Sequence, residues 1–273
     1  MTESAAQCDK HEQYPPVRRR KYHAGRVLLV VTVMTIVFFT LFWLIYTFAI
    51  ERENNAPGEP RERSVRTAIS RGTPDELREL LKSNPETRDF VKDYDAERVP
   101  LEEIDISGDV KNGEIPLFLQ WDKRWGYDNY GSGMLAITGC GPTCLSMVAV
   151  ALTGDLSLNP RAVADFAAEN GYYAAGVGTS WTLMTDGAAQ LGLSSRVIPL
   201  FEPTILSELR DGSPIICSVG SGDFTQDGHY IVLTGLNSDG TVAVNDPNSI
   251  IRSEKDWELA KIMEQVKNLW VFS

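Results

Sequence analysis

The sequence predicts an α+β fold for most of the chain, preceded by a single transmembrane helix. Three observations support this. Residues 27–50 form an uncharged apolar run, residues 115–192 contain helical segments that end at glycines, and residues 214–272 contain short β-branched runs separated by Gly, Asn and Asp. Because the helical patterns precede the strand patterns instead of alternating with them, we expect an antiparallel sheet rather than a doubly wound parallel one.

The apolar run of residues 27–50 is long enough to span the ~30 Å hydrocarbon core of a bilayer at about 1.5 Å per residue. A cleaved signal peptide is the alternative, but its apolar core would have only about 7–15 residues, and no Ala-x-Ala-like site follows Ile50. Basic residues gather before the run, whereas charges of both signs follow it. The sequence therefore predicts a single-pass protein of the cell membrane, with residues 1–26 in the cytoplasm and the remainder outside.

Two segments separate the predicted membrane helix from the main domain. Residues 51–72 are polar, with Pro, Gly and alternating charges, and are interpreted as a flexible stalk. Residues 73–114 are predicted to hold two short helices, and Thr73 and Glu76 are expected to form a capping box at the start of the first one. The main domain is then expected to occupy residues 115–273.

Proline and glycine divide this main domain into helices followed by strands. Helices are predicted over residues 142–152, 160–169 and 180–191, each with a glycine at or just after its end. Strands are predicted over residues 214–219, 230–236, 241–245 and 269–272.

Charge and histidine content exclude several classes of function. Residues 51–273 carry 34 acidic and 20 basic side chains of the 37 and 26 in the whole chain, so nucleic acid and anionic lipid are not expected as partners. His229 is the only histidine after residue 50, which excludes a zinc site built on several histidines. No phosphate-binding glycine loop is found, and the sequence predicts neither a metal nor a cofactor.

Cys140 is the predicted nucleophile. Gly139 and Gly141 place it in a tight turn that opens onto a helix, where free backbone amides favour a thiolate. Cys144 and Cys217 are interpreted as small apolar core residues, because one lies within the helix and the other within a strand. Three cysteines after residue 50 cannot all pair with one another, so at least one is expected to be free or paired between chains.

His229 and Asp246 are the predicted partners of this nucleophile. A thiol hydrolase needs a base that titrates near neutrality, and His229 is the only such group after residue 50. If residues 237–240 form a four-residue loop, Leu236 faces Thr241, and this register brings Asp246 to within about 7–8 Å of His229 between α-carbons on one face. The carboxylate would then reach the imidazole and fix its tautomer.

These motifs give the sequence a resemblance to the papain-like bacteriocin-processing peptidases of cysteine peptidase family thirty-nine, over residues 115–273. The segments that carry the resemblance are GCGPTCLSMV, GHYIVLTG and NDPNS, in that order, with Gln120 after a strand-like run. The resemblance implies a papain-like cysteine peptidase fold in which Cys140 attacks, His229 is the base and Asp246 orients it. It also implies that Gln120 supplies hydrogen bonds to the oxyanion.

Two features depart from the pattern of that family. Nineteen residues separate Gln120 from Cys140, where the leader peptidases have only a few, and the chain lacks the nucleotide-binding loop of the transporter to which they are usually fused. Those domains also work in the cytoplasm, whereas this one is predicted outside the cell. Cleavage after a double glycine therefore receives little support.

The predicted function is hydrolysis of a peptide or amide bond through a thioester on Cys140. The expected partner is a peptide or protein substrate, with cell-wall peptides among the candidates. One alternative is a non-catalytic surface module that binds a peptide in a papain-like cleft. Another is an acyl transferase that uses the same residues. The presence of Cys140, His229, Asp246 and Gln120 favours catalysis, but hydrolysis and transfer share every step up to the acyl-enzyme.

Aromatic residues and aspartates near the motifs have two interpretations each. Either substrate contacts or core packing would explain Trp121, Trp125, Tyr172, Tyr173 and Trp181. Four aspartates lack the spacing of an EF-hand and are interpreted as solvated loop acids rather than calcium ligands: Asp122, Asp186, Asp223 and Asp227.

Overall fold

The structure is a computed structural model that describes residues 34, 40–41, 72–96 and 98–273. The predicted cytoplasmic tail, membrane helix and stalk thus lie almost wholly outside the described residues. Within the described part of the chain, no helix combines the length and the apolar content needed to cross a membrane. Backbone contacts separate a unit Met1–Pro57 from a unit Gly58–Ser273, and the elements described below all belong to the second unit.

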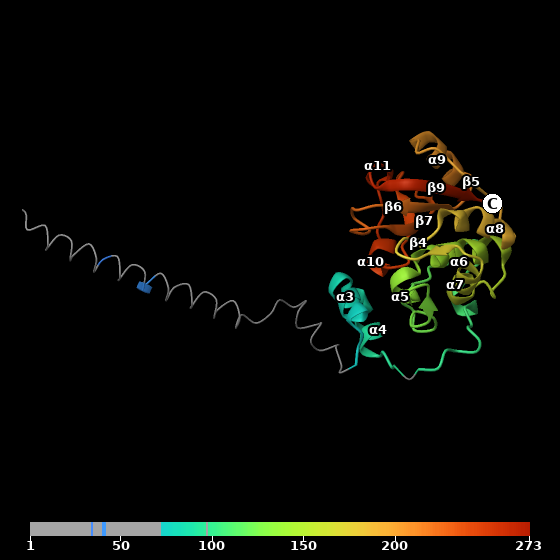
Figure 1. Cartoon of the computed structure of the whole chain (residues 1–273). Helices are drawn as coiled ribbons and strands as arrows, with labels where there is room; N and C mark the ends of the chain where they lie inside the picture. Colours follow the sequence, from blue (N-terminus) through green and yellow to red (C-terminus); the bar gives the residue numbers. More distant parts are fainter. Residues whose placement is uncertain (1–33, 35–39, 42–71, 97) are drawn as a thin grey trace, which may run out of the picture. The chain divides into compact units, whose positions relative to one another are not determined.

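The second unit contains helices and antiparallel strands, as expected for an α+β fold (Figure 1). Its α-helices are α3 (Asp75–Ser83), α4 (Arg88–Lys92), α5 (Leu135–Thr138), α6 (Cys140–Thr153), α7 (Pro160–Glu169), α8 (Asp186–Gln190), α9 (Glu202–Arg210), α10 (Ile250–Ser253) and α11 (Leu259–Met263). Short 3-10 helices are η1 (Pro85–Thr87), η2 (Ser107–Asp109) and η3 (Trp181–Met184).

The main sheet has five strands in the order β5-β9-β6-β7-β8, all antiparallel to their neighbours. These strands are β5 (Ser195–Val197), β6 (Ile215–Val219), β7 (His229–Leu236), β8 (Val242–Asn245) and β9 (Val266–Phe272). Two small hairpins lie outside it, β1 (Asn129–Tyr130) with β2 (Gly133–Met134) and β3 (Tyr173–Ala174) with β4 (Gly178–Thr179). All four predicted strands are therefore present, with slightly different ends.

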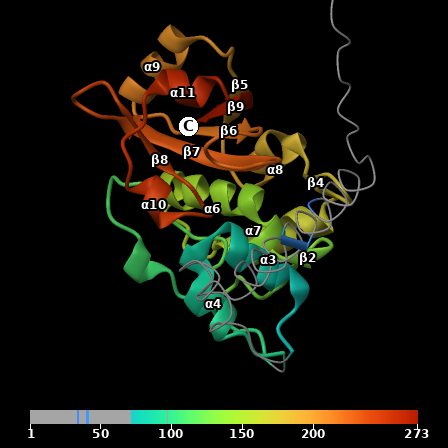
Figure 2. The same cartoon turned by 90° about the vertical axis from the view of Figure 1, so that its left-hand side faces the viewer.

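Helices cover both faces of the sheet, with α6 on one side and α9 and α11 on the other (Figure 2). Side chains of a strand point alternately to its two faces. In β7, Tyr230 and Val232 accordingly join the core against α6, while Ile231 and Leu233 join the core against α9 and α11. Because both faces are covered, all of β6 and the first five residues of β7 are buried, without alternation between buried and exposed positions.

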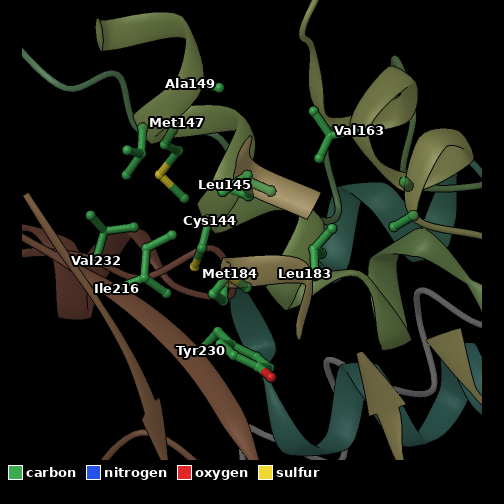
Figure 3. Close-up of a cluster of buried hydrophobic side chains, with 14 of the residues drawn as sticks. Cys144, Leu145, Met147, Ala149, Val163, Leu183, Met184, Ile216, Tyr230 and Val232 are labelled. Carbon is green, nitrogen blue, oxygen red and sulfur yellow. The ribbon is translucent and has the colours of Figure 1, made fainter. Parts of the chain in front are cut away.

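The core between α6 and the sheet contains Cys144 together with large apolar side chains, among them Met147, Ile216 and Tyr230 (Figure 3). Residues Gly141–Val150 of α6 are all buried. A helix that is apolar on every side is expected to lie inside the protein, and α6 does. This arrangement holds the N-terminal end of α6, and with it Cys140, in a fixed position beside the sheet.

Two predicted helices agree closely with the structure. Residues 160–169 form α7 with the expected ends, because the Asn159 side chain accepts a hydrogen bond from Ala162 N at the start and Gly171 adopts a φ of 76° after the end. The helix predicted over residues 142–152 begins earlier, at Cys140, and ends before Gly154, which has a φ of 71°.

Other predictions of local structure were wrong. The helix expected over residues 180–191 is two pieces, η3 and α8, because its first turn closes through bonds from Leu183 N to Ser180 O and from Thr185 N to Thr182 O. The expected capping box is absent. Pro74 occupies the N-cap of α3, and it has no side-chain acceptor to offer the first helical amides.

The loop between β7 and β8 is longer than predicted. Leu236 pairs with Val242 rather than with Thr241, because Asp239 accepts hydrogen bonds from the amide and hydroxyl of Thr241 and keeps that residue in the loop. A bulge just after Leu233 then shifts the register by one residue. From the pair Leu233–Val244 onward, β7 and β8 pair as the predicted four-residue loop would have required.

Candidate active site

Cys140 is the first residue of α6 and is partly exposed, whereas the residues that follow it are buried. The two flanking glycines are required by close packing. A β-carbon at Gly139 would lie 2.5 Å from Leu135 O, and one at Gly141 would lie 2.7 Å from the Thr179 side chain. Residues of α5 and β4 therefore pack closely against the two glycines that flank Cys140.

His229 is the first residue of β7 and is 6% exposed. Its Nε2 lies 2.8 Å from Oδ1 of Asp246, which follows directly after β8. Cys140 lies near enough to His229 to help raise the pKa of the imidazole, and because Nε2 is occupied by the carboxylate, Nδ1 is the ring atom left for the thiol. The structure therefore brings Cys140, His229 and Asp246 together in that order.

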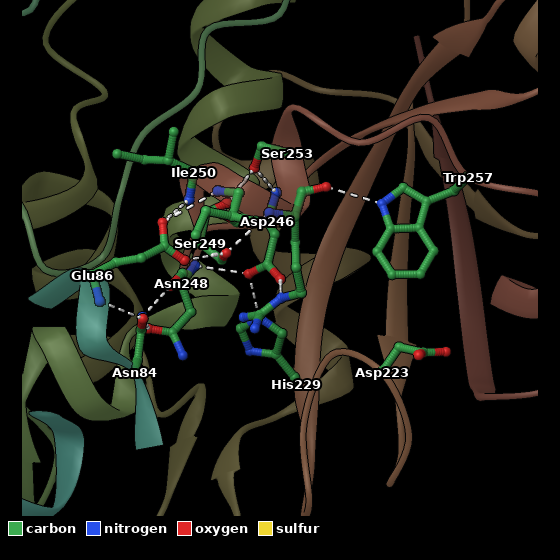
Figure 4. Close-up of polar contacts among 12 residues, drawn as sticks. Asn84, Glu86, Asp223, His229, Asp246, Asn248, Ser249, Ile250, Ser253 and Trp257 are labelled. Atoms are coloured by element: carbon green, nitrogen blue, oxygen red, sulfur yellow. Dashed lines mark hydrogen bonds and ion pairs between the residues drawn. The ribbon is translucent and has the colours of Figure 1, made fainter. Parts of the chain in front are cut away.

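Asp246 is fully buried and accepts hydrogen bonds on both oxygens (Figure 4). Oδ1 receives His229 and the amide of Asn248 at 2.8 Å, and Oδ2 receives Arg252 Nε at 2.5 Å. Burial alone would raise the pKa of this carboxyl, but the charges and hydrogen bonds of His229 and Arg252 outweigh burial and lower it. Asp246 is accordingly ionised at neutral pH.

The contact that lowers the pKa of Asp246 raises the pKa of the His229 imidazole. Burial disfavours the imidazolium and would lower the pKa of His229, but the Asp246 carboxylate and the Cys140 side chain raise it, to about 10. The imidazole therefore carries a proton at neutral pH, beside an ionised Asp246.

Gln120 is 3% exposed and lies next to the loop that carries Asp246. Its backbone amide donates to Pro247 O at 2.7 Å, and its Nε2 donates to Ala136 O at 2.6 Å. The Nε2 group carries a second hydrogen, for which the described residues offer no acceptor, and Oε1 is buried without a partner. Gln120 is thus fixed against α5 with one donor uncommitted.

The other two cysteines of the described chain are buried, and neither is in a disulfide. Burial is the main reason why the pKa of Cys144 is raised well above its usual value, with the nearby Cys140 as a smaller cause. Burial also raises the pKa of Cys217. Both lie in apolar cores, as predicted, and Cys140 is the only partly exposed thiol of the three.

The structure distinguishes core positions from surface positions for four of the five aromatic residues that had two interpretations. Trp125 and Tyr172 are buried in the core, whereas Trp181 is 49% exposed and packs edge-on against Trp270. Trp121 is half-buried and donates from Nε1 to Asn248 O at 3.2 Å. It therefore supports the loop that carries Asp246.

Two of the four aspartates considered as calcium ligands bond to other side chains of the protein. Asp122 pairs with Arg124 at 2.8 Å, and Asp223 accepts from Gln265 Nε2 at 2.8 Å. Within the described ranges, no three His, Cys, Asp or Glu side chains converge as a metal site would require.

Sequence reasoning missed three side chains that hold the Asp246 carboxylate or its loop. Arg252 contacts the carboxylate itself, and Asn84 and Glu86 hydrogen-bond to residues that follow it. For Arg252 the sequence did contain a local signal, because Ser249 can cap a short helix three residues before it, and in the structure Ser249 Oγ accepts from Arg252 N. No local signal existed for the other two, because more than 160 residues separate them from their partners.

Comparison with known proteins gives a matching family and several matching solved structures. The model of the Peptidase C39 like family matches residues 113–272. The crystal structure of the peptidase domain of Streptococcus ComA, described as a bi-functional ABC transporter involved in a quorum sensing pathway, matches with 22% identity and a TM-score of 0.37. That alignment covers 50% of this chain and 90% of the ComA domain. No curated protein matches.

Proposed function

The chain belongs to the Peptidase C39 like family, which is a family of cysteine peptidases, and from this premise we propose that it hydrolyses a peptide or amide bond through a thioester on Cys140. The observation that carries the proposal is the 2.8 Å contact between His229 and the buried Asp246 carboxylate, with Cys140 near enough to the imidazole to help raise its pKa. A buried acid, a histidine and a partly exposed thiol in this order are what nucleophilic catalysis by cysteine requires.

The proposed first step transfers the acyl group to sulfur. The Cys140 thiolate attacks the carbonyl carbon, an S–C bond forms, and the carbonyl electrons move onto oxygen. When they return, the C–N bond breaks and the leaving amine takes the proton from His229. Water then attacks the thioester while His229 accepts its proton. Sulfur leaves and the carboxylic acid is released.

Asp246 has a different proposed role from His229. It is buried, its pKa is lowered, and Arg252 stabilises its charge, so it stays ionised while the imidazole gains and loses a proton. Its contact with Nε2 fixes the ring so that Nδ1 faces the thiol. Asp246 is therefore proposed to orient the base and to stabilise the imidazolium, and not to transfer a proton.

Gln120 is proposed as a donor to the oxyanion, together with the backbone amide of Cys140. Its support is burial, a fixed amide group and one uncommitted Nε2 hydrogen. Because the bond to Ala136 O holds the amide in place, the second hydrogen is proposed as a preorganised donor to the developing charge.

We further propose that the catalytic domain is anchored to the cell membrane by residues 27–50 and faces outward. The uncharged run and its basic N-terminal flank support this orientation. Accessible substrates would then be secreted peptides, surface proteins or cell-wall peptides. Protease treatment of intact cells should release a fragment that contains residues 73–273. Protection of that fragment until the cells are lysed would contradict the orientation.

The proposed activity can be tested with a peptide library and the full chain in detergent. Mass spectrometry should find peptides cleaved by the wild-type protein but not by Cys140→Ser, which keeps the size of the side chain. An added amine nucleophile should not appear in the products, since its incorporation would indicate acyl transfer. Peptides that bind equally well to both proteins and are never cleaved would indicate a binding module.

A further inference from the structure

The N-terminal helical segment, residues 75–92, lies outside the matched family region but contacts the proposed active site. It is anchored by apolar packing, in which Leu77, Leu81 and Phe90 join a core with Met134 and Ala136. Through its middle turn it also reaches the Asp246 loop, which we define as residues 246–253 and which includes α10. The segment is therefore placed to act on that loop.

Glu86 makes the most concentrated of these contacts (Figure 4). Its Oε1 accepts from Ser249 Oγ at 2.5 Å, and its Oε2 accepts from the amides of Ile250 and Ile251 at 2.8 and 3.2 Å. A single carboxylate thus satisfies three donors at the start of α10. Because α10 has only four residues and few backbone bonds of its own, such contacts contribute much of what holds its conformation.

Asn84 adds a second, independent attachment. It is buried, and its Nδ2 donates to the backbone oxygen of Asn248 at 2.5 Å. Its Oδ1 accepts from the backbone amide of Glu86 at 3.1 Å, so the same side chain also fixes the position of Glu86. The Asp246 loop is consequently held by two adjacent side chains that come from one turn of the N-terminal segment.

We propose that Glu86 is a positioning residue for the reaction, so that the N-terminal helical segment forms part of the active site. Its effect passes through a short series of contacts. Ser249 Oγ donates to Glu86 and accepts from the amide of Arg252 at 3.0 Å, and Arg252 Nε in turn holds Oδ2 of Asp246. The other oxygen of Asp246 is the one that meets His229.

This series predicts a specific consequence of losing the Glu86 carboxylate. The start of α10 would no longer be held, Arg252 would hold Asp246 less firmly, and the carboxylate would spend less time against His229. Because Glu86 is proposed to act through the Asp246 loop and not to touch the substrate, kcat should fall while KM is kept. The inference rests on the proposed function, since it assigns Glu86 a role in orienting the base.

The test compares Glu86→Gln with Glu79→Gln in the full chain. Both changes remove one charge from the same segment, but Glu79 lies on the outer face of α3 and bonds to Lys82. Glu86→Gln should lower kcat about 2- to 30-fold with KM unchanged, whereas Glu79→Gln should behave like the wild type. Circular dichroism first establishes folding, and Glu86→Asp takes the place of Glu86→Gln if the latter does not fold.

The same substitution made in the Asp246→Asn variant distinguishes a positioning role of Glu86 from a general loss of structure. If Glu86 acts through Asp246, Glu86→Gln should change the rate less than twofold when Asp246→Asn is already present. An equal fold-loss in both backgrounds would overturn the inference, as would equal kcat values for Glu86→Gln and Glu79→Gln. A wild-type protein with neither turnover nor alkylation at Cys140 would instead refute the proposed function, which is a distinguishable result.

Discussion

Arg252 donates from Nε to Oδ2 of Asp246 at 2.5 Å, on the carboxylate oxygen that His229 does not use. The buried acid therefore has a cationic partner besides the imidazole. Without that partner, a carboxylate at this depth would be protonated more readily, because burial opposes its charge. The contact explains how Asp246 can remain ionised through every step proposed for the reaction.

Among the three thiols after residue 50, alkylation by iodoacetamide should select one. In the folded protein Cys140 should react, while Cys144 and Cys217 should be protected by burial and by their raised pKa values. All three should react in urea. Peptide mapping of the carbamidomethyl groups measures this. Preferential modification of Cys144 without denaturant would move the nucleophile to that residue.

The pH dependence of stability should report the His229–Asp246 pair. The pKa of His229 is raised from 6.5 to about 10 in the fold, so its contribution is complete below about pH 6.5 and is lost as the pH rises through about 10. The pKa of Asp246 is lowered from its ordinary value of 3.8. Its contribution to stability is therefore complete above about pH 3.8 and is lost as the pH falls through the lower pKa that it has in the fold.

Urea unfolding at pH 6 and pH 9.5 measures this effect. The free energy of unfolding should fall between the two values in the wild type more than it does in His229→Gln, which cannot titrate. The same pH dependence in both proteins would show that the ring does not gain a proton in the fold.

Replacing Asp246 by Asn should lower kcat/KM but retain more activity than His229→Ala. An amide oxygen can still accept from Nε2, so the ring keeps part of its orientation, but the imidazolium loses its counter-charge. In related triads such a change costs as much as about 10⁴-fold. Steady-state kinetics on folded variants provides the measurement. A loss larger than that of His229→Ala would contradict the proposed division of roles.

Gln120→Ala should slow substrate turnover by on the order of 10² to 10³ and leave alkylation of Cys140 by a small reagent unchanged. An oxyanion donor acts on the transition state of acyl transfer and not on the nucleophile. Gln190→Ala is the matched control, because that amide bonds to Tyr172 and has no proposed part in the reaction. Equal turnover by the two variants would remove Gln120 from the site.

Local sequence signals predicted local features of the fold well. Pro160 and Gly171 indicated both ends of α7, because start and stop residues act within a few positions of their own helix. The same local signals failed for features that depend on contacts between residues far apart in the sequence. Helix α9 was missed in the segment between the last predicted helix and the first predicted strand. The insertion of β9 between β5 and β6 follows from long-range pairing that no local pattern encodes.

The proposed site shows the same limit. Cys140 and His229 could be proposed from sequence because the chain contains few thiols and histidines, and Asp246 because a hairpin register relates it to His229. The contribution of Glu86 could not be foreseen. It depends on how the N-terminal segment packs through Leu77, Leu81 and Phe90, and that packing exists only in the folded protein.

The most direct test of the account is the turnover of a cleaved library peptide by His229→Ala that circular dichroism shows to be folded. His229 is the only imidazole after residue 50, so no other side chain there can both accept and return the proton near neutral pH. The account predicts a loss of at least about 10³-fold in kcat/KM. Hydrolysis at the wild-type rate would contradict the assignment of Cys140, His229 and Asp246 as the catalytic site.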